Sequence, residues 1–214
     1  KFVYDETLKE KNGFPLSFCV NHSIESKYGP IVRYSSDQEI LDYKYRQKFN
    51  LSILINSLFL NAIWKKINES LKNEFYIRID NLFQIEGLED IKNFLIKSYA
   101  FFQKKDYVSS IHLLIPYIEE TIRIIIRKSG NVDNVLKTQK TAFFRKIEFG
   151  GLIENEIVKS LIDENLLETI DIFLLREDQS NLRNLLCHGL ISEKECSEFN
   201  NTYLFYILFK LIFI

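Results

Sequence analysis

Methionine is absent from the chain, and proline, glycine, cysteine and histidine are scarce, with 3, 7, 3 and 3 occurrences in 214 residues. The cysteines Cys19, Cys187 and Cys196 are scattered and have no metal-ligand spacing. An odd number of such cysteines is typical of a reducing compartment, so we expect a cytoplasmic protein without a disulfide framework. The dispersed histidines predict no metal site, and no glycine-rich phosphate loop or other cofactor motif is present.

The start of the sequence has no signal-peptide pattern, and its first residue is Lys1, so we expect a fragment or a trimmed chain. Hydrophobic content of 46% and charged content of 27% indicate a globular protein with one substantial core. A net charge of −1 provides no overall attraction to nucleic acid.

The charges are nevertheless distributed unevenly. Residues 121–149 hold seven basic and two acidic residues, whereas residues 150–200 hold four basic and eleven acidic ones. If the protein binds RNA, we expect the phosphate-binding charge to come from the basic stretch or from a second subunit. The candidate RNA-binding residues are Arg127, Lys128, Lys137, Lys140, Arg145 and Lys146.

Helical periodicity dominates most of the sequence and predicts an all-α fold. No proline or glycine interrupts residues 36–75, which predict one long helix capped by Ser36 or Asp37. Turn signals punctuate the first 35 residues, and apolar alternation over residues 14–20 predicts a short strand. Further helices are expected at residues 88–104, 107–128, 154–161, 163–175, 178–189 and 193–214.

Several local signals set the ends of these helices. Asp106 is expected to cap the helix that follows it, in which Pro116 predicts a kink or an unpaired carbonyl. Gly150 and Gly151 predict a flexible turn, and a capping box over residues 192–195 predicts the start of the last helix. That helix is apolar nearly all round, but it is too short for a membrane span, so we expect it in the core or a subunit interface.

The run RNLLCHG at residues 183–189 sets three polar side chains into this otherwise apolar helical stretch. Arg183 has a planar cationic group suited to phosphate, and His188 can give and take protons near neutral pH. On an ideal helix Asn184 and His188 share one face, whereas Arg183 lies about 140° from His188. This separation favours a site shared between two elements. Gly189 is expected to end the helix, which would leave His188 in a last turn that favours the imidazolium.

A purely structural interpretation of the run remains open. Arg183 can pair with Glu177 or Asp178, Asn184 can bond to backbone, and His188 can cap its own helix. Upstream, the four-residue spacing of Glu119 and Arg123 favours an ion pair between them, with orientation of Arg183 by Glu119 as the alternative. Cys187 is expected to be a small core residue rather than a nucleophile, and His112 a half-buried or surface side chain.

The pattern Arg183-Asn184-x-x-x-His188-Gly189 resembles the RNxxxHG signature of DUF4209, a domain family of unknown function within the wider HEPN superfamily. The stretch IPYIEETIR at residues 115–123 is similar to the helix that precedes this motif in DUF4209 relatives. The resemblance covers roughly residues 85–214. It implies a HEPN-like helical domain at residues 81–214, preceded by an additional helical or irregular region at residues 1–80.

Many HEPN proteins cleave RNA without a metal ion, as homodimers with two facing motifs, and often serve as toxins or phage-defence effectors. The resemblance therefore implies that His188 is the general base for a ribose 2′-OH, that Arg183 holds the phosphate, and that Asn184 orients the histidine or binds RNA. It places Glu119, Arg123 and Gly189 in supporting roles. It implies no cofactor, with RNA, a second copy and an antitoxin or defence protein as partners. Because some HEPN members do not cleave RNA, a non-catalytic dimerisation or partner-binding module is the alternative.

Overall fold

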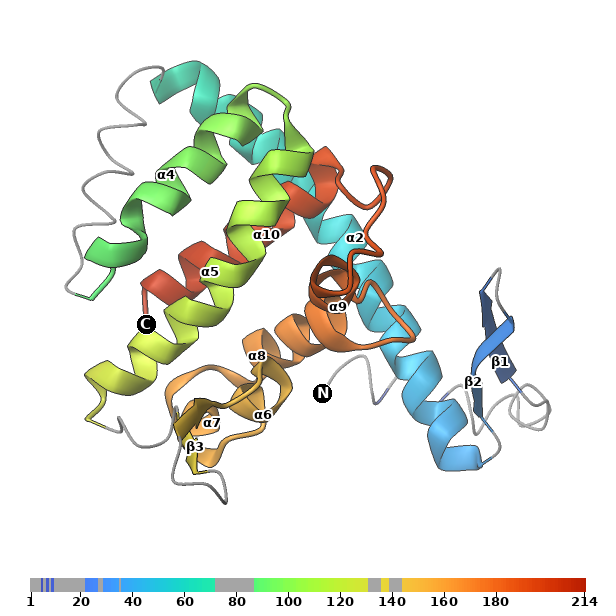
Figure 1. Cartoon of the computed structure of the whole chain (residues 1–214). Helices are drawn as coiled ribbons and strands as arrows, with labels where there is room; N and C mark the ends of the chain where they lie inside the picture. The colour runs from blue at the N-terminus through green and yellow to red at the C-terminus, as the bar shows by residue number, and fades with distance from the viewer. Residues whose placement is uncertain are drawn as a thin grey trace.

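The computed structural model is all-α, as predicted, with two short β-hairpins added to the helices (Figure 1). The strand expected over residues 14–20 and the domain boundary expected after residue 80 both lie outside the described residues. The structure describes residues 5, 7, 9, 22–26, 29–34, 36–71, 87–130, 136–138 and 144–214.

The long helix α2 spans Asp37–Leu71 and confirms the expected helix as far as its described end. Its start is a capping box, in which Glu39 N donates to Ser36 Oγ at 3.2 Å and Ser36 N donates to the Glu39 carboxylate at 3.0 Å. Ile53 is buried in the core, but Leu58 and Ile63, which belong to the same apolar pattern, are exposed. The periodicity therefore predicted the helix correctly but not which residues its buried face holds.

Three helices surround the middle of the core. Helices α4 (Glu89–Gln103) and α5 (Tyr107–Lys128) form an antiparallel hairpin, and α10 (Glu198–Ile212) packs against α5 and α2 (Figure 1). Asp106 caps α5 by accepting from Ser109 N at 3.0 Å. Within α10 most apolar side chains are buried, which confirms that the apolar C-terminal segment is a core helix. No helix among the described residues is both long and apolar enough to cross a membrane.

The start of α10 differs from the expectation. Ser192 and Glu195 do bond to each other, with Ser192 N donating to the Glu195 carboxylate at 2.8 Å, but they close a turn. The helix begins after Ser197, whose hydroxyl accepts from Asn200 N at 3.2 Å. Cys196, between the two caps, is buried at 5% exposure.

Four short helical segments connect α5 to the motif region. They are α6 (Phe149–Ile153), α7 (Glu156–Leu161), α8 (Glu164–Ile170) and the π-helix η3 (Asp171–Leu175). The flexible turn expected at Gly150 and Gly151 is wrong, since both residues lie inside α6. Phe149 and Leu152 are fully buried there, and this burial stabilises a helix despite the poor helical propensity of glycine.

The two hairpins lie outside the helical core. Strand β1 (His22–Ser26) pairs with β2 (Gly29–Tyr34), and the pair lies beside the start of α2 (Figure 1). Strand β3 (Leu136–Thr138) pairs with β4 (Phe144–Lys146), just before α6. Both pairs are antiparallel, and each forms a separate two-stranded sheet in the described part of the chain.

Candidate functional site

The motif run forms the short helix α9, which spans Leu182–Cys187 and starts later than the expected Asp178. Asp178 instead pairs with Arg46 of α2 at 2.9 Å and is 7% exposed, so the chain before α9 is held against α2. Asn181, with a φ of 50°, turns the chain into the helix, and Leu182 at 1% exposure anchors it in the core. Among the described contacts, Arg183 pairs with Glu119 and not with Asp178.

Gly189 ends α9, as predicted, with a φ of 66°. Gly189 N donates to Leu186 O at 3.1 Å and Leu190 N donates to Leu185 O at 2.8 Å, which together make a Schellman motif. His188 is the C-cap residue of this helix and its side chain is exposed, without a hydrogen-bond partner in the described part of the chain.

Cys187 is exposed, so the expectation that it belongs to the core is wrong. Helix α9 is only six residues long, and the residue of this helix that is buried in the core is Leu182, at the opposite end from Cys187. Cys196, by contrast, is buried, and burial raises the pKa of its thiol. Among the described residues, no group of histidine, cysteine and acidic side chains can hold a metal ion.

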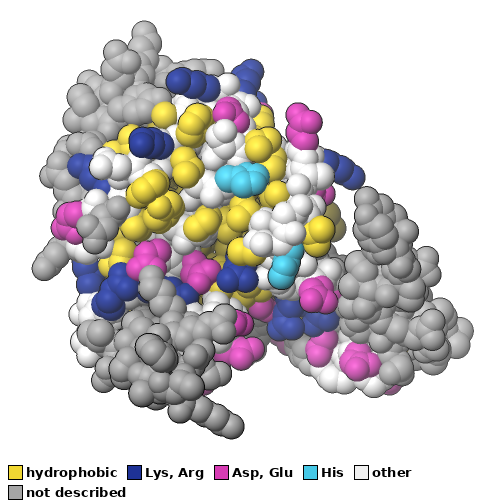
Figure 2. Space-filling view, viewed as in Figure 1, with side chains coloured by type: hydrophobic (Ala, Val, Ile, Leu, Met, Phe, Trp, Pro, Cys, Tyr) yellow, Lys and Arg dark blue, Asp and Glu magenta, His cyan; other side chains and the backbone are white. Residues whose placement is uncertain are grey.

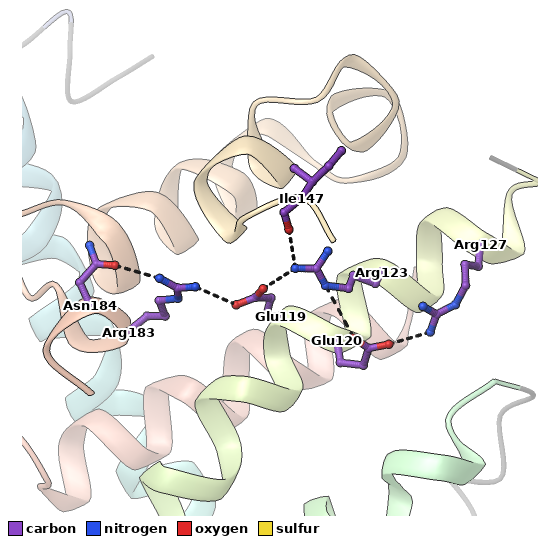
Figure 3. A network of polar contacts seen from close by, with 7 residues as sticks. All are labelled: Glu119, Glu120, Arg123, Arg127, Ile147, Arg183 and Asn184. Carbon is purple, nitrogen blue, oxygen red and sulfur yellow. Dashed lines mark hydrogen bonds and ion pairs between the residues drawn. The ribbon is translucent and has the colours of Figure 1, made fainter. Parts of the chain in front are cut away.

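Arg183 reaches from α9 toward α5, and two groups hold its guanidinium. Its Nη2 atom lies 3.5 Å from the Glu119 carboxylate and its Nη1 atom donates to Asn184 Oδ1 at 3.3 Å (Figure 3). Its Nε atom is buried and has no partner among the described residues. The side chain retains 25% exposure, so the guanidinium is both positioned and accessible.

Asn184 fastens α9 to the element before it. Its Nδ2 atom donates to the Leu175 carbonyl, the last residue of η3, at 3.0 Å, and its Oδ1 atom accepts from Arg183. The described contacts of this side chain therefore involve Arg183 and not the His188 ring. Asn184 contacts the arginine, whereas the resemblance implied that it orients the histidine or binds RNA.

Glu119 and Arg123 extend this arrangement along α5. One carboxylate oxygen of Glu119 accepts from Arg123 and the other faces Arg183 (Figure 3). The ion pair with Arg123 and the contact with Arg183, which the sequence offered as alternatives, are therefore both present. Arg123 is 3% exposed, and its Nη2 atom also donates to the Ile147 carbonyl at 2.6 Å. Glu120 lies 3.7 Å from Arg123 and 2.8 Å from Arg127. Charges of opposite sign thus alternate from α9 along one side of α5.

A cavity of about 340 Å³ lies at this network, between the middle of α5, the start of α6 and α9. In the space-filling view, hydrophobic side chains gather over α4 and α5, and acidic and basic side chains lie beside them (Figure 2). A larger cavity of about 460 Å³ lies between α2, α8 and α10 and contains none of the motif residues. The residues that line the smaller cavity are Pro116, Glu119, Glu120, Arg123, Ile147, Glu148 and Arg183.

The structure brings only some of the expected basic residues near this cavity. Arg127 is paired with Glu120, and Lys128 is exposed at the end of α5. Lys140 lies outside the described residues. Lys137, Arg145 and Lys146 lie on the β3–β4 hairpin, where the register places Lys137 opposite Arg145, and their side chains are not among those described.

Sequence reasoning did not identify the groups that hold the motif in place. Arg46 lies 132 residues before its partner Asp178, and the carbonyls of Leu175 and Ile147 come from backbone. No spacing rule connects residues so distant, and a backbone acceptor has no residue type to detect. No family model matches the chain, and no curated protein or solved structure matches it.

Proposed function

We propose that this protein is a metal-independent endoribonuclease of the HEPN type. The observation that supports it best is the placement of Arg183 at a cavity, held by Glu119 and Asn184, on the same short helix that ends in the exposed His188. A fixed guanidinium and a free imidazole are the groups that phosphodiester transfer through a ribose hydroxyl requires.

In the proposed reaction His188 takes the proton of a ribose 2′-OH, and the resulting oxygen attacks the adjacent phosphorus. The bond from phosphorus to the 5′-oxygen breaks, which leaves a 2′,3′-cyclic phosphate and a 5′-OH end. Arg183 donates to the phosphate oxygens, where negative charge increases in the transition state. DNA is not a substrate in this scheme because it lacks the attacking hydroxyl.

A second copy of the chain completes the proposed site. The leaving 5′-oxygen needs a proton while His188 accepts one, and the motif of one protomer contains a single histidine. In a homodimer with facing motifs, the imidazolium of the second copy supplies that proton. The resemblance extends the proposal to a cytoplasmic toxin or phage-defence effector with an antitoxin or defence protein as partner.

The test is incubation of the protein with RNA in the presence of EDTA. The wild type is expected to release products with 2′,3′-cyclic phosphate ends, detected by mass spectrometry, and to leave a 2′-deoxy analogue intact. His188→Ala and Arg183→Ala should each abolish cleavage. His112→Ala is the matched control, because His112 is also exposed, on α5, and bonds only to the Val108 carbonyl among its described contacts. Equal cleavage by the wild type and the His188→Ala variant would refute the proposal.

A non-catalytic dimerisation or partner-binding module is the second candidate. The observation that favours it is the compensation of Arg183 by Glu119, within a network where Glu119 and Glu120 oppose three arginines. A surface whose arginines are mostly compensated attracts an anionic backbone less than an uncompensated basic one does. This candidate predicts that no RNA is cleaved under any condition, and that His188→Ala changes dimer stability or partner binding instead.

A further inference from the structure

Glu119 occupies a special place in the charge network because it is the one described carboxylate that contacts arginines on both α5 and α9. Its contact with Arg123 spans one helical turn, whereas its contact with Arg183 joins residues 64 apart in the sequence. The carboxylate is 18% exposed. It therefore forms the polar link between the core hairpin and the motif helix.

The α5 end of this link is rigid. Arg123 is 3% exposed and is held by the Ile147 carbonyl at 2.6 Å as well as by Glu119. A cation buried to this degree requires its counter-charge, since removing one partner leaves an uncompensated charge in a poorly solvated place. Glu119 is consequently held in place by Arg123 and cannot follow Arg183 if that side chain moves.

The α9 end of the link is more open. Arg183 retains 25% exposure, and its contacts are longer, at 3.5 Å to Glu119 and 3.3 Å to Asn184. Asn184 is itself fixed to the Leu175 carbonyl. Two fixed acceptors therefore hold the guanidinium through its Nη1 and Nη2 atoms, while its buried Nε atom has no described partner.

We propose that Glu119 is a positioning residue that fixes the plane of the Arg183 guanidinium, so that its remaining N–H groups point to the phosphate of bound RNA. This inference rests on the proposed function. Pre-organisation of a donor avoids the cost of ordering it during the reaction, and misplacement of such a group by about 1 Å can cost on the order of 100-fold in rate. The effect of Glu119 on the reaction passes entirely through Arg183.

The variant Glu119→Gln tests this role with nearly unchanged volume. The amide retains one acceptor oxygen for Arg123 but turns an NH₂ group toward the other arginine, so only one of the two contacts survives. Glu120→Gln is the matched control, since Glu120 is the next residue on α5 and pairs with Arg123 and Arg127 but not with Arg183. Thermal unfolding of both variants shows that each is folded.

The first measurement does not depend on activity. The ¹⁵N-labelled Nη2–H signal of Arg183, assigned by its loss in Arg183→Lys, is expected to exchange slowly with water in the wild type and in Glu120→Gln, because Nη2 is the atom that faces Glu119. It should exchange rapidly in Glu119→Gln. Unchanged slow exchange in Glu119→Gln would overturn the proposal. If that variant does not fold, Glu119→Asp, whose shorter side chain draws the carboxylate back, is expected to give the same rapid exchange.

The second measurement is steady-state RNA cleavage. Glu119→Gln is expected to lower kcat by about 10- to 100-fold with little change in KM, because Arg183 without its Glu119 contact is misplaced for the phosphate contacts that it makes mainly in the transition state. Glu156→Gln, at an exposed carboxylate on α7 outside the residues that line the cavity, should retain kcat within a few-fold. A rise in KM alone would contradict a positioning role. If the wild type shows slow Nη2–H exchange that is lost in Glu119→Gln but cleaves no RNA, the proposed function fails while the structural link between Glu119 and Arg183 stands.

Discussion

The carboxylate of Glu119 on α5 lies 3.5 Å from the guanidinium of Arg183 on α9. This contact joins the middle of the core hairpin to the first turn of the motif helix, and it places the arginine beside a cavity. It also makes the motif depend on residues that are distant in sequence. The consequences can be measured on the folded protein even before an RNA substrate is known.

Asn184 should contribute to stability as well as to the site. Asn184→Ala removes the bond to the Leu175 carbonyl and the contact with Arg183, so we expect a loss of about 1 kcal/mol in the free energy of unfolding. Urea denaturation measures it. Asn165→Ala is the control, because the side chain of Asn165 is exposed and bonds only to Asp163 in its described contacts, and it should change stability by less. Equal effects would show that the bond to η3 contributes nothing.

Gly189 and Gly150 should respond in opposite ways to the same substitution. Gly189 has a φ of 66°, which an L-residue adopts at a cost of about 1–2 kcal/mol, so Gly189→Ala should destabilise the protein. Gly150 lies in α6 with no atom within 4 Å of an added Cβ, so Gly150→Ala should stabilise it by about 0.4–1 kcal/mol. Differential scanning calorimetry of the two variants should therefore show shifts of opposite sign in Tm.

The cap of α5 should make stability depend on acid pH. Hydrogen bonds from the Ser109 side chain and backbone lower the pKa of Asp106 below its ordinary value of 3.8. A lowered folded-state pKa means that this stabilisation is present above the unfolded-state pKa and is lost as the pH falls through the folded-state value. The Tm difference between the wild type and Asp106→Ala should thus be present at neutral pH and shrink below pH 3.8. A difference constant down to strongly acidic pH would contradict this.

Leu208 should be among the most sensitive positions of the apolar last helix. It is fully buried in α10, so Leu208→Ala should cost about 2–5 kcal/mol through lost burial and the cavity left behind. Val108→Ala is the comparison, since Val108 is 42% exposed and should cost less than about 0.5 kcal/mol. Chemical denaturation resolves the difference. Similar values for the two variants would argue against a core position for this helix.

Local signals in the sequence predicted most of the helices. Asp106 and Gly189 act within one turn of their own backbone, so the helix ends that they define follow from neighbouring residues. The failures occurred where distant packing decided the outcome. Burial of Phe149 and Leu152 makes a helix of a segment containing two glycines, and the pairing of Asp178 with Arg46 delays the start of α9.

The same division applies to the site. The residue types Arg183, Asn184 and His188 make a cation, an amide and an imidazole available, and the backbone freedom of the glycine after them ends the helix. What these groups touch depends on the packing of α5 near α9, which joins residues that have no fixed spacing in sequence. The contact between Glu119 and Arg123 follows from their four-residue spacing on one helix. The contact between Glu119 and Arg183 depends on the packing of α5 near α9, which helical periodicity does not predict.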